Sequence, residues 1–146
     1  MAKKPSALRE QIRTRIRKAG LRCTMARVSV LERLHSATAP MSHADLAAEL
    51  SPIGFDKATI YRNLVELSEL GMVARVELGD HVWRFELIRE EDEHSADHPH
   101  FVCVDCGDVS CLPGVSVDVG KQPGDLRSKI GDVTQVLLKG HCERCI

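Results

Sequence analysis

Two Cys-x-x-Cys motifs near the C-terminal end place the strongest constraint on what this chain can fold into. Cys103 and Cys106 form the first motif, Cys142 and Cys145 form the second, and 35 residues separate the two. One such turn lets two thiolates reach the same ion, and two turns complete the tetrahedral sulfur site of structural zinc. His141, beside the second motif, is an alternative to one of the sulfurs. Because four thiolates leave no open coordination position, the motifs predict a structural zinc without a catalytic role.

Composition explains why a chain of 146 residues would need such a metal. Only 3% of its residues are aromatic, which is too few to build one large core. Domains well below about 80 residues usually need a metal or a disulfide, so we expect small domains and a zinc. The chain has no long apolar run and no apolar segment after its basic start. We therefore expect a cytoplasmic protein that makes no membrane contact and whose paired cysteines bind metal.

The net charge of −1 hides an asymmetry between the two halves. Residues 1–89 hold 15 Lys and Arg against 10 Asp and Glu, whereas residues 90–146 hold 5 against 11. The first 33 residues contain 10 basic and 2 acidic side chains. This is the electrostatic pattern of a segment that lies against phosphates, although a solvated helix face is the plainer alternative.

Apolar spacing in the first half predicts three helices before residue 52. Ser6 and Thr24 are the expected N-caps of the first two, each followed by an apolar stripe at helical spacing. Ser42 and Asp45 match a capping box, in which each side chain satisfies an amide at the start of a short third helix. This third helix is expected to end before Pro52.

A fourth helix is the candidate recognition helix. It is expected to begin after Asp56 and to end at Gly71, with hydrogen-bond donors gathered in its first two turns. After it the apolar period changes from 3.6 to 2 around a turn at Gly79, which predicts a hairpin with Trp83 and Phe85 on one face. Helices followed by a hairpin are the plan of a winged helix-turn-helix; a helical domain that merely packs is the alternative. The candidate DNA-binding residues are Arg22, Arg27, Lys57, Thr59, Tyr61, Arg62 and Asn63.

Histidines just before the first cysteine motif predict a second metal site. If a strand begins there, His98 and His100 project from one face and Cys103 from the other, which keeps two metal sites apart. Glu86, on the polar face of the hairpin, is the nearest candidate carboxylate, and such oxygen and nitrogen ligands suit iron, manganese or zinc. A polar surface without metal is the plainer alternative. Further candidate ligands are His35, His43, His94, Asp118 and Cys111.

Several motifs together resemble the ferric uptake regulator family of bacterial metal-dependent repressors, over nearly the whole chain. In chain order they are Leu21-Arg22-x-Thr24-x-x-Arg27-x-x-Val30-Leu31, Ala58-Thr59-Ile60-Tyr61-Arg62-Asn63-Leu64, Gly71-Met72-Val73, Phe85-Glu86-Leu87, His98-x-His100, Cys103-x-x-Cys106-Gly107 and Gly140-x-Cys142-x-x-Cys145.

The resemblance implies a homodimer that binds inverted-repeat operators in double-stranded DNA, with Tyr61 and Arg62 as DNA contacts. It also implies a regulatory ion bound by the glutamate of the hairpin, the two histidines and a further histidine before the third helix. Pro40 stands where that further histidine is expected. Cys111 stands near a position where some members carry a carboxylate ligand, which admits thiolate chemistry.

These observations predict an α+β fold in three parts. Residues 1–88 form a winged-helix DNA-binding domain, residues 89–97 an acidic hinge, and residues 98–146 a small α/β dimerisation domain that contains the zinc. The predicted function is metal-responsive regulation of metal-homeostasis or oxidative-stress genes, most simply repression, without a small-molecule substrate. The alternatives are a zinc-stabilised DNA-binding protein that senses nothing and a thiol or peroxide sensor. An enzyme is disfavoured because no base and nucleophile pair stands in register.

Overall fold

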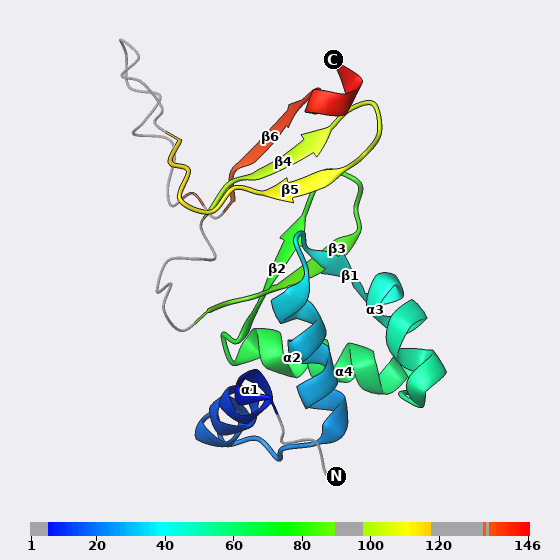
Figure 1. The fold of residues 1–146 in the computed structure, drawn as a ribbon, viewed down its shortest axis with the longest axis vertical. Coiled ribbons are helices and arrows are strands. Elements are labelled where there is room, and N and C mark those ends of the chain that lie inside the picture. The colour runs from blue at the N-terminus through cyan, green and yellow to red at the C-terminus, as the bar shows by residue number, and fades with distance from the viewer. Residues whose placement is uncertain (1–5, 90–97, 118–132, 134) are drawn as a thin grey trace. The chain divides into compact units, whose positions relative to one another are not determined.

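The computed structural model describes residues 6–89, 98–117, 133 and 135–146 (Figure 1). The chain divides into two compact units, with the boundary after Arg89. The predicted hinge therefore lies, apart from Arg89 itself, outside the described residues. No helix in the described ranges is long and apolar enough to cross a membrane.

The described part of the first unit contains four α-helices, as the sequence predicted. They are α1 (Ala7–Lys18), α2 (Met25–Ser36), α3 (His43–Leu50) and α4 (Lys57–Glu69), and the 3₁₀ turn η1 (Ser51–Ile53) joins α3 to α4. Pro52 lies in that turn, because proline can begin a helical turn but cannot donate inside one.

Local capping explains where the helices begin. The Ser6 hydroxyl accepts a hydrogen bond from the amide of Arg9, and Thr24 does the same for the amide of Arg27. Ser42 and Asp45 form the predicted capping box. Asp56 occupies the N-cap position of α4, but its side chain makes no capping hydrogen bond. The backbone amides in the first turn of α4 could therefore donate hydrogen bonds to a bound anion.

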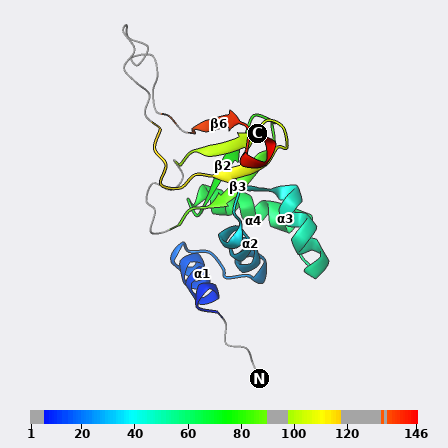
Figure 2. The same ribbon diagram turned by 45° about the horizontal axis from the view of Figure 1, so that its top comes forward.

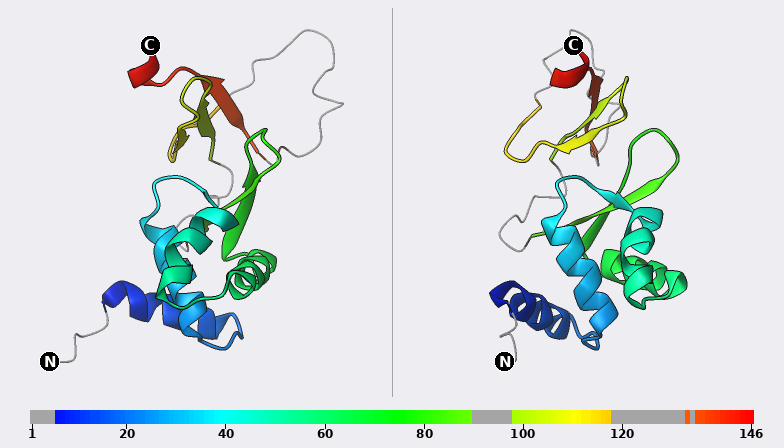
Figure 3. Two further views of the ribbon diagram at one scale, coloured as in Figure 1. Left: turned by 90° about the vertical axis from the view of Figure 1, so that its right-hand side faces the viewer. Right: turned by 45° about the vertical axis from the view of Figure 1, so that its right-hand side comes forward.

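A three-stranded sheet completes the first unit. Its strands are β1 (Met41–Ser42), β2 (Val73–Glu77) and β3 (Trp83–Leu87), in the order β1-β3-β2 with all neighbours antiparallel. The hairpin of β2 and β3 is the predicted wing, and Figure 3 shows it extending beyond the helices of its unit. Strand β1 was not predicted, because two residues carry no readable alternation and Met41 pairs with the distant Phe85.

The core of the first unit lies between the helices and the sheet. Ile16, Leu46, Ile60 and Leu64 are fully buried in it, and Phe85 reaches it from β3. Trp83 and Phe85 lie on the same face of β3, as expected, and line one pocket, but 52% of the surface of Trp83 is exposed whereas Phe85 is buried. Trp83 is the first residue of β3, whereas Phe85 lies at its middle.

The described part of the second unit is a small mixed sheet. Its strands are β4 (His100–Cys103), β5 (Val109–Cys111) and β6 (Leu137–Gly140), and β4 is central, antiparallel to β5 and parallel to β6. A final 3₁₀ turn, η4 (Glu143–Cys145), lies beside the turn between β4 and β5 (Figure 2). Both cysteine motifs therefore come together at one end of this sheet.

Candidate metal centres and nucleic-acid interface

The four motif cysteines form one cluster. Their sulfur atoms all lie within 4.8 Å of one another, and no histidine replaces any of them in this group. Cys103 ends β4, Cys106 lies in the turn that follows, Cys142 is the N-cap of η4 and Cys145 is its last residue. Gly107 closes the first turn with a φ of 73°, a left-handed conformation that glycine adopts without strain.

The spacing of the sulfurs fits a zinc ion. Zinc–sulfur bonds of about 2.3 Å in a tetrahedron put neighbouring sulfurs about 3.8 Å apart. The Sγ atoms of Cys106 and Cys142, one from each motif, are 3.7 Å apart. The donor set is therefore that of a closed structural zinc site, as the sequence predicted.

Backbone amides prepare one sulfur of the cluster for a cation. Amides of Cys106 and Cys142 donate to the Cys103 sulfur, the latter at 3.4 Å, and lower the pKa of this thiol to about 6. Hydrogen bonds with the side chains of Cys142 and Cys103 raise the pKa of the Cys145 thiol to about 12. The thiols of Cys103 and Cys145 therefore differ in acidity. Zinc binding would release the protons that remain on the cluster, because only thiolates bind zinc.

A hydrogen bond and an ion pair tie the cysteine motifs together outside the sulfur cluster. His141, offered above as an alternative zinc ligand, instead places Nδ1 2.7 Å from Asp105 Oδ2. Arg144 donates to Asp108 at 2.6 Å. Each pair joins the turn after β4 to the segment after β6, so both support the relative placement of the two motifs.

A second group of candidate ligands lies on the sheet of the second unit. His98, His100 and Cys111 each offer a ligand atom within 4.8 Å of the other two. The imidazole centroids of His98 and His100 are 4.8 Å apart. Cys103 is three residues beyond His100 on the same strand, so the pleat separates this group from the four-cysteine cluster.

Glu86, the predicted carboxylate ligand, belongs to the wing of the first unit. It lies on β3 opposite Ala74 of β2. Its neighbour Phe85 points into the core, so the pleat directs Glu86 to the other face of the sheet. The side chain is thus not used for packing among the helices.

The remaining ligand candidates lie elsewhere or outside the described residues. His35 lies in the last turn of α2, where its carbonyl accepts a hydrogen bond from Arg89. His43 begins α3 and donates from Nε2 to the Lys57 carbonyl at 2.8 Å. The candidates that fall outside the described ranges are His94 and Asp118.

The first half of α4 presents a polar, exposed face. Lys57, Tyr61 and Arg62 are exposed and Thr59 is half-buried, and Arg62 donates to the Thr59 hydroxyl at 3.4 Å. A helix N-terminus carries a partial positive charge, which adds to the charges of Lys57 and Arg62. This face has the shape and charge that suit the major groove of DNA.

Two of the candidate DNA-binding residues are not available on this exposed face, because one is buried and the other is bonded within the protein. Asn63 is only 6% exposed, because it is three residues after the buried Ile60 and so shares its face. Arg27 forms an ion pair with Glu66 and donates to the carbonyl of Arg22 at 2.7 Å. Arg27 therefore ties α2 to α4, whereas Arg22 keeps an exposed side chain.

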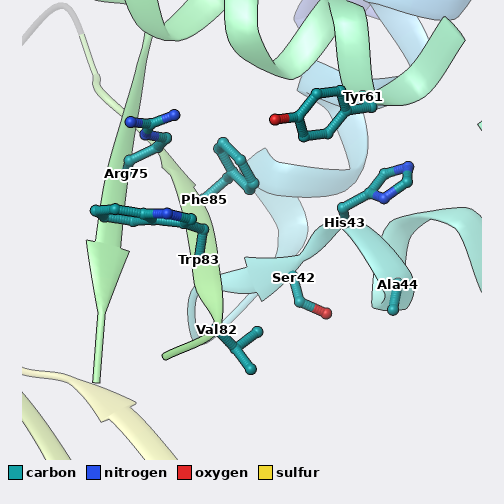
Figure 4. Close-up of a pocket in the computed structure, with 8 residues that line it drawn as sticks. All are labelled: Ser42, His43, Ala44, Tyr61, Arg75, Val82, Trp83 and Phe85. Carbon is teal, nitrogen blue, oxygen red and sulfur yellow. The ribbon is translucent and has the colours of Figure 1, made fainter. Parts of the chain in front are cut away.

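A pocket of about 220 Å³ borders the exposed face of α4 (Figure 4). Its wall includes Arg75, whose guanidinium lies 4.5 Å from the centre of the Trp83 ring. Sequence reasoning missed Arg75, since a single basic residue on a short strand carries no signal of its surroundings. The lining residues are Ser42, His43, Ala44, Tyr61, Arg75, Val82, Trp83 and Phe85. The pocket joins the β2–β3 hairpin and α4 in one surface.

Comparison with known proteins agrees with this architecture. The model of the ferric uptake regulator family matches residues 18–121. The ferric uptake regulation protein of Shigella flexneri is 31% identical over 138 residues, which cover 88% of this chain and 86% of that protein. The protein of the same name from Pseudomonas aeruginosa is 39% identical over 97 residues, or 64% of this chain and 69% of that protein.

Solved structures share the fold. The ferric uptake regulator of Vibrio cholerae has a TM-score of 0.62 at 25% identity, over 88% of this chain and 98% of that chain. The regulator of Pseudomonas aeruginosa, solved with manganese, has a TM-score of 0.60 at 27% identity, over 90% and 98%. The α+β fold class and the resemblance seen in the sequence are thereby confirmed. The chain belongs to the ferric uptake regulator family of metal-responsive transcription regulators.

Proposed function

We propose that this chain is a cytoplasmic repressor that binds an inverted-repeat DNA operator as a homodimer under the control of a divalent metal. Residues 1–88 serve as the DNA-binding domain, residues 89–97 as the hinge and residues 98–146 as the dimerisation domain. The observation that carries this proposal is the exposed polar face on the first half of α4, in a winged-helix unit. The expected targets are genes of metal homeostasis or of the response to oxidative stress.

The charge distribution along α4 favours an approach by its N-terminal half. Lys57 and Arg62 are exposed there, while Glu66 is already engaged by Arg27. Lys57 and the amides of the first turn suit phosphate, and Tyr61 and Arg62 are long enough to reach base edges. Basic residues thus supply affinity, and the recognition helix supplies sequence choice.

Dimerisation follows from the limited reach of one such helix. The 13 residues of α4 span about 20 Å, which covers one half-site. Two copies related by a two-fold axis would read two half-sites about 34–36 Å apart, the spacing of one turn of DNA. An inverted repeat is the sequence that matches this symmetry.

The proposed regulatory ligands are Glu86, His98 and His100. Glu86 belongs to the first unit and the two histidines to the second. A bound cation supplies charge and coordination bonds that would join ligands from both units, and so favour one arrangement of the DNA-binding domains. Metal binding and DNA binding would then strengthen each other by the same factor.

The recognition-helix assignment is tested with Arg62→Ala. A duplex is first selected from a random pool by the wild-type protein, and the affinity of each variant for this duplex is then measured with metal present. We expect Arg62→Ala to weaken binding by about 1–3 kcal/mol and to relax sequence preference at one position in each half-site. Lys139→Ala, which removes an exposed cation from β6, is the matched control. Unchanged affinity of Arg62→Ala would refute the assignment.

A further inference from the structure

Strand register places a cysteine directly opposite one of the proposed regulatory ligands. Cys111 of β5 pairs with His100 of β4 in the antiparallel ladder. Residues opposite one another in such a ladder project their side chains to the same face. The thiol of Cys111 and the imidazole of His100 are therefore neighbours because of the backbone, whatever the rest of the chain does.

The hydrogen-bond pattern makes this pair a close one. Ladder bonds of 2.9 Å run from the amide of Leu112 to the carbonyl of Pro99 and from the amide of Cys103 to the carbonyl of Asp108. Pairs in an antiparallel ladder alternate between hydrogen-bonded and non-hydrogen-bonded types, and these bonds assign His100 and Cys111 to the second type. Cα atoms in such pairs are only about 4.5 Å apart, which brings the side chains closest.

His98 completes a group of three donors. It precedes His100 by two residues and lies on the same face, with the ring centroids 4.8 Å apart. The ligand atoms of His98, His100 and Cys111 all lie within 4.8 Å of one another. Two nitrogens and one sulfur at this spacing can bind the same ion. All three residues belong to the second unit, so this geometry does not depend on the placement of the first.

The sulfur changes which ion the group prefers. Oxygen and nitrogen ligands suit manganese and iron, whereas a thiolate favours softer or borderline ions, of which zinc is the divalent one most often bound by cysteine and histidine. Zinc also takes four ligands in a tetrahedron. Two imidazoles, one thiolate and one carboxylate make a complete set of that kind.

We infer that Cys111 is a thiolate ligand of the regulatory metal and that it makes the regulatory site selective for Zn(II) over Mn(II) and Fe(II). The inference rests on the proposed function for the fourth ligand, Glu86, and for the regulatory role of the site. The contribution of Cys111 rests on the sheet register and on the spacing of the three ligand atoms within the second unit. The competing interpretation is that Cys111 is a half-buried strand residue that only packs.

Cobalt(II) tests the thiolate directly, because it takes zinc sites and absorbs light. Full-length protein is prepared with zinc in the four-cysteine cluster, the second site is cleared with a mild chelator, and Co(II) is added while bound zinc is measured. We expect a sulfur-to-cobalt charge-transfer band, with zinc retained. Cys111→Ser should lose this band, whereas Cys23→Ala, which removes the other cysteine outside the cluster, should keep it. A wild-type cobalt complex without the band overturns the inference.

Selectivity is measured by competition between Zn(II) and Mn(II) for the second site in metal-buffered solution. Loss of residues that merely orient metal ligands typically costs about 10–100-fold in affinity, so exchange of a ligand itself should cost as much. Cys111→Asp should therefore lower the ratio of zinc to manganese affinity by about tenfold or more. An unchanged ratio overturns the inference.

The proposed function and this inference fail in distinguishable ways. If metal strengthens operator binding but cobalt shows no sulfur band, the role of Cys111 is refuted and metal control stands. If cobalt shows the band but operator binding is the same with and without metal, the thiolate site stands and its regulatory role is refuted.

Discussion

The Nε2 atom of His43 lies 2.8 Å from the carbonyl oxygen of Lys57, so the first residue of α3 is bonded to the first residue of α4. The same imidazole meets the ring of Tyr61 edge-on, with centroids 5.4 Å apart. Both contacts fall on the turns of α4 that we propose to enter DNA. We therefore expect His43 to position the N-terminal turns of α4, and Figure 4 shows its ring beside Tyr61.

Replacement of His43 should weaken operator binding without loss of metal. A hydrogen bond of this kind contributes about 0.5–1.5 kcal/mol, so we expect His43→Ala to lower affinity about two- to tenfold. His43→Gln keeps an N–H that can donate to the Lys57 carbonyl and should recover part of the loss. Fluorescence anisotropy with the selected duplex measures both. Equal affinity of His43→Ala and wild type would contradict the positioning role.

Loss of one cluster cysteine should remove the structural zinc. Cys142→Ser leaves three thiolates, and we expect the purified variant to hold about one zinc fewer per chain and to unfold its second unit at lower denaturant concentration. Metal analysis and urea unfolding measure these effects. Cys23→Ala, in the first unit, should change neither zinc content nor the unfolding of the second unit. A variant of Cys142 with full zinc content would contradict the four-cysteine site.

Acid should weaken the docking of α1 on α2. Arg9 donates to both carboxylate oxygens of Glu32, at 2.5 and 3.0 Å, and the bonded guanidinium lowers the pKa of Glu32 below its ordinary value of 4.5. A lowered pKa contributes stability that is present above the unfolded value and is lost as pH falls through the folded one. Glu32→Gln should thus lower stability at neutral pH and flatten its fall below about pH 4.5.

The control for this prediction is Glu69→Gln at the exposed end of α4. Unfolding of both variants is followed by circular dichroism from pH 7 to pH 3. If Glu32→Gln and wild type lose stability in parallel across this range, the ion pair contributes nothing to the acid sensitivity of the first unit.

Local signals in the sequence were sufficient for the helices and for the zinc cluster. Caps such as Ser42 act within three residues, and each Cys-x-x-Cys turn brings two sulfurs together by itself. The sequence pattern predicts Asn63 among the exposed polar residues of α4, but Asn63 is buried. The buried face of a helix can include polar residues that lie beside the apolar ones, so apolar residues alone do not mark its full width. The spacing of Ile60 to Asn63 is itself a signal that could have corrected this.

Contacts between distant segments could not be predicted. The pairing of Met41 with Phe85 and of His100 with Cys111 depends on strand register, which a single sequence does not fix when the strands are short. The stacking of Arg75 on Trp83 depends on register in the same way. These non-local contacts determine the local geometry of the wing and of the ligand group His98, His100 and Cys111. That geometry therefore had to come from the structure.

The central claim is that metal at the second site controls DNA binding. The most direct measurement is the affinity of the full chain for its selected inverted repeat, with zinc kept in the cysteine cluster and with chelator, Zn(II), Mn(II) or Fe(II) at defined free concentrations. Coupling between sites is typically about 5- to 150-fold, so we predict tightening in that range, with Zn(II) acting at the lowest free concentration. The same affinity in chelator and in every metal would contradict the account.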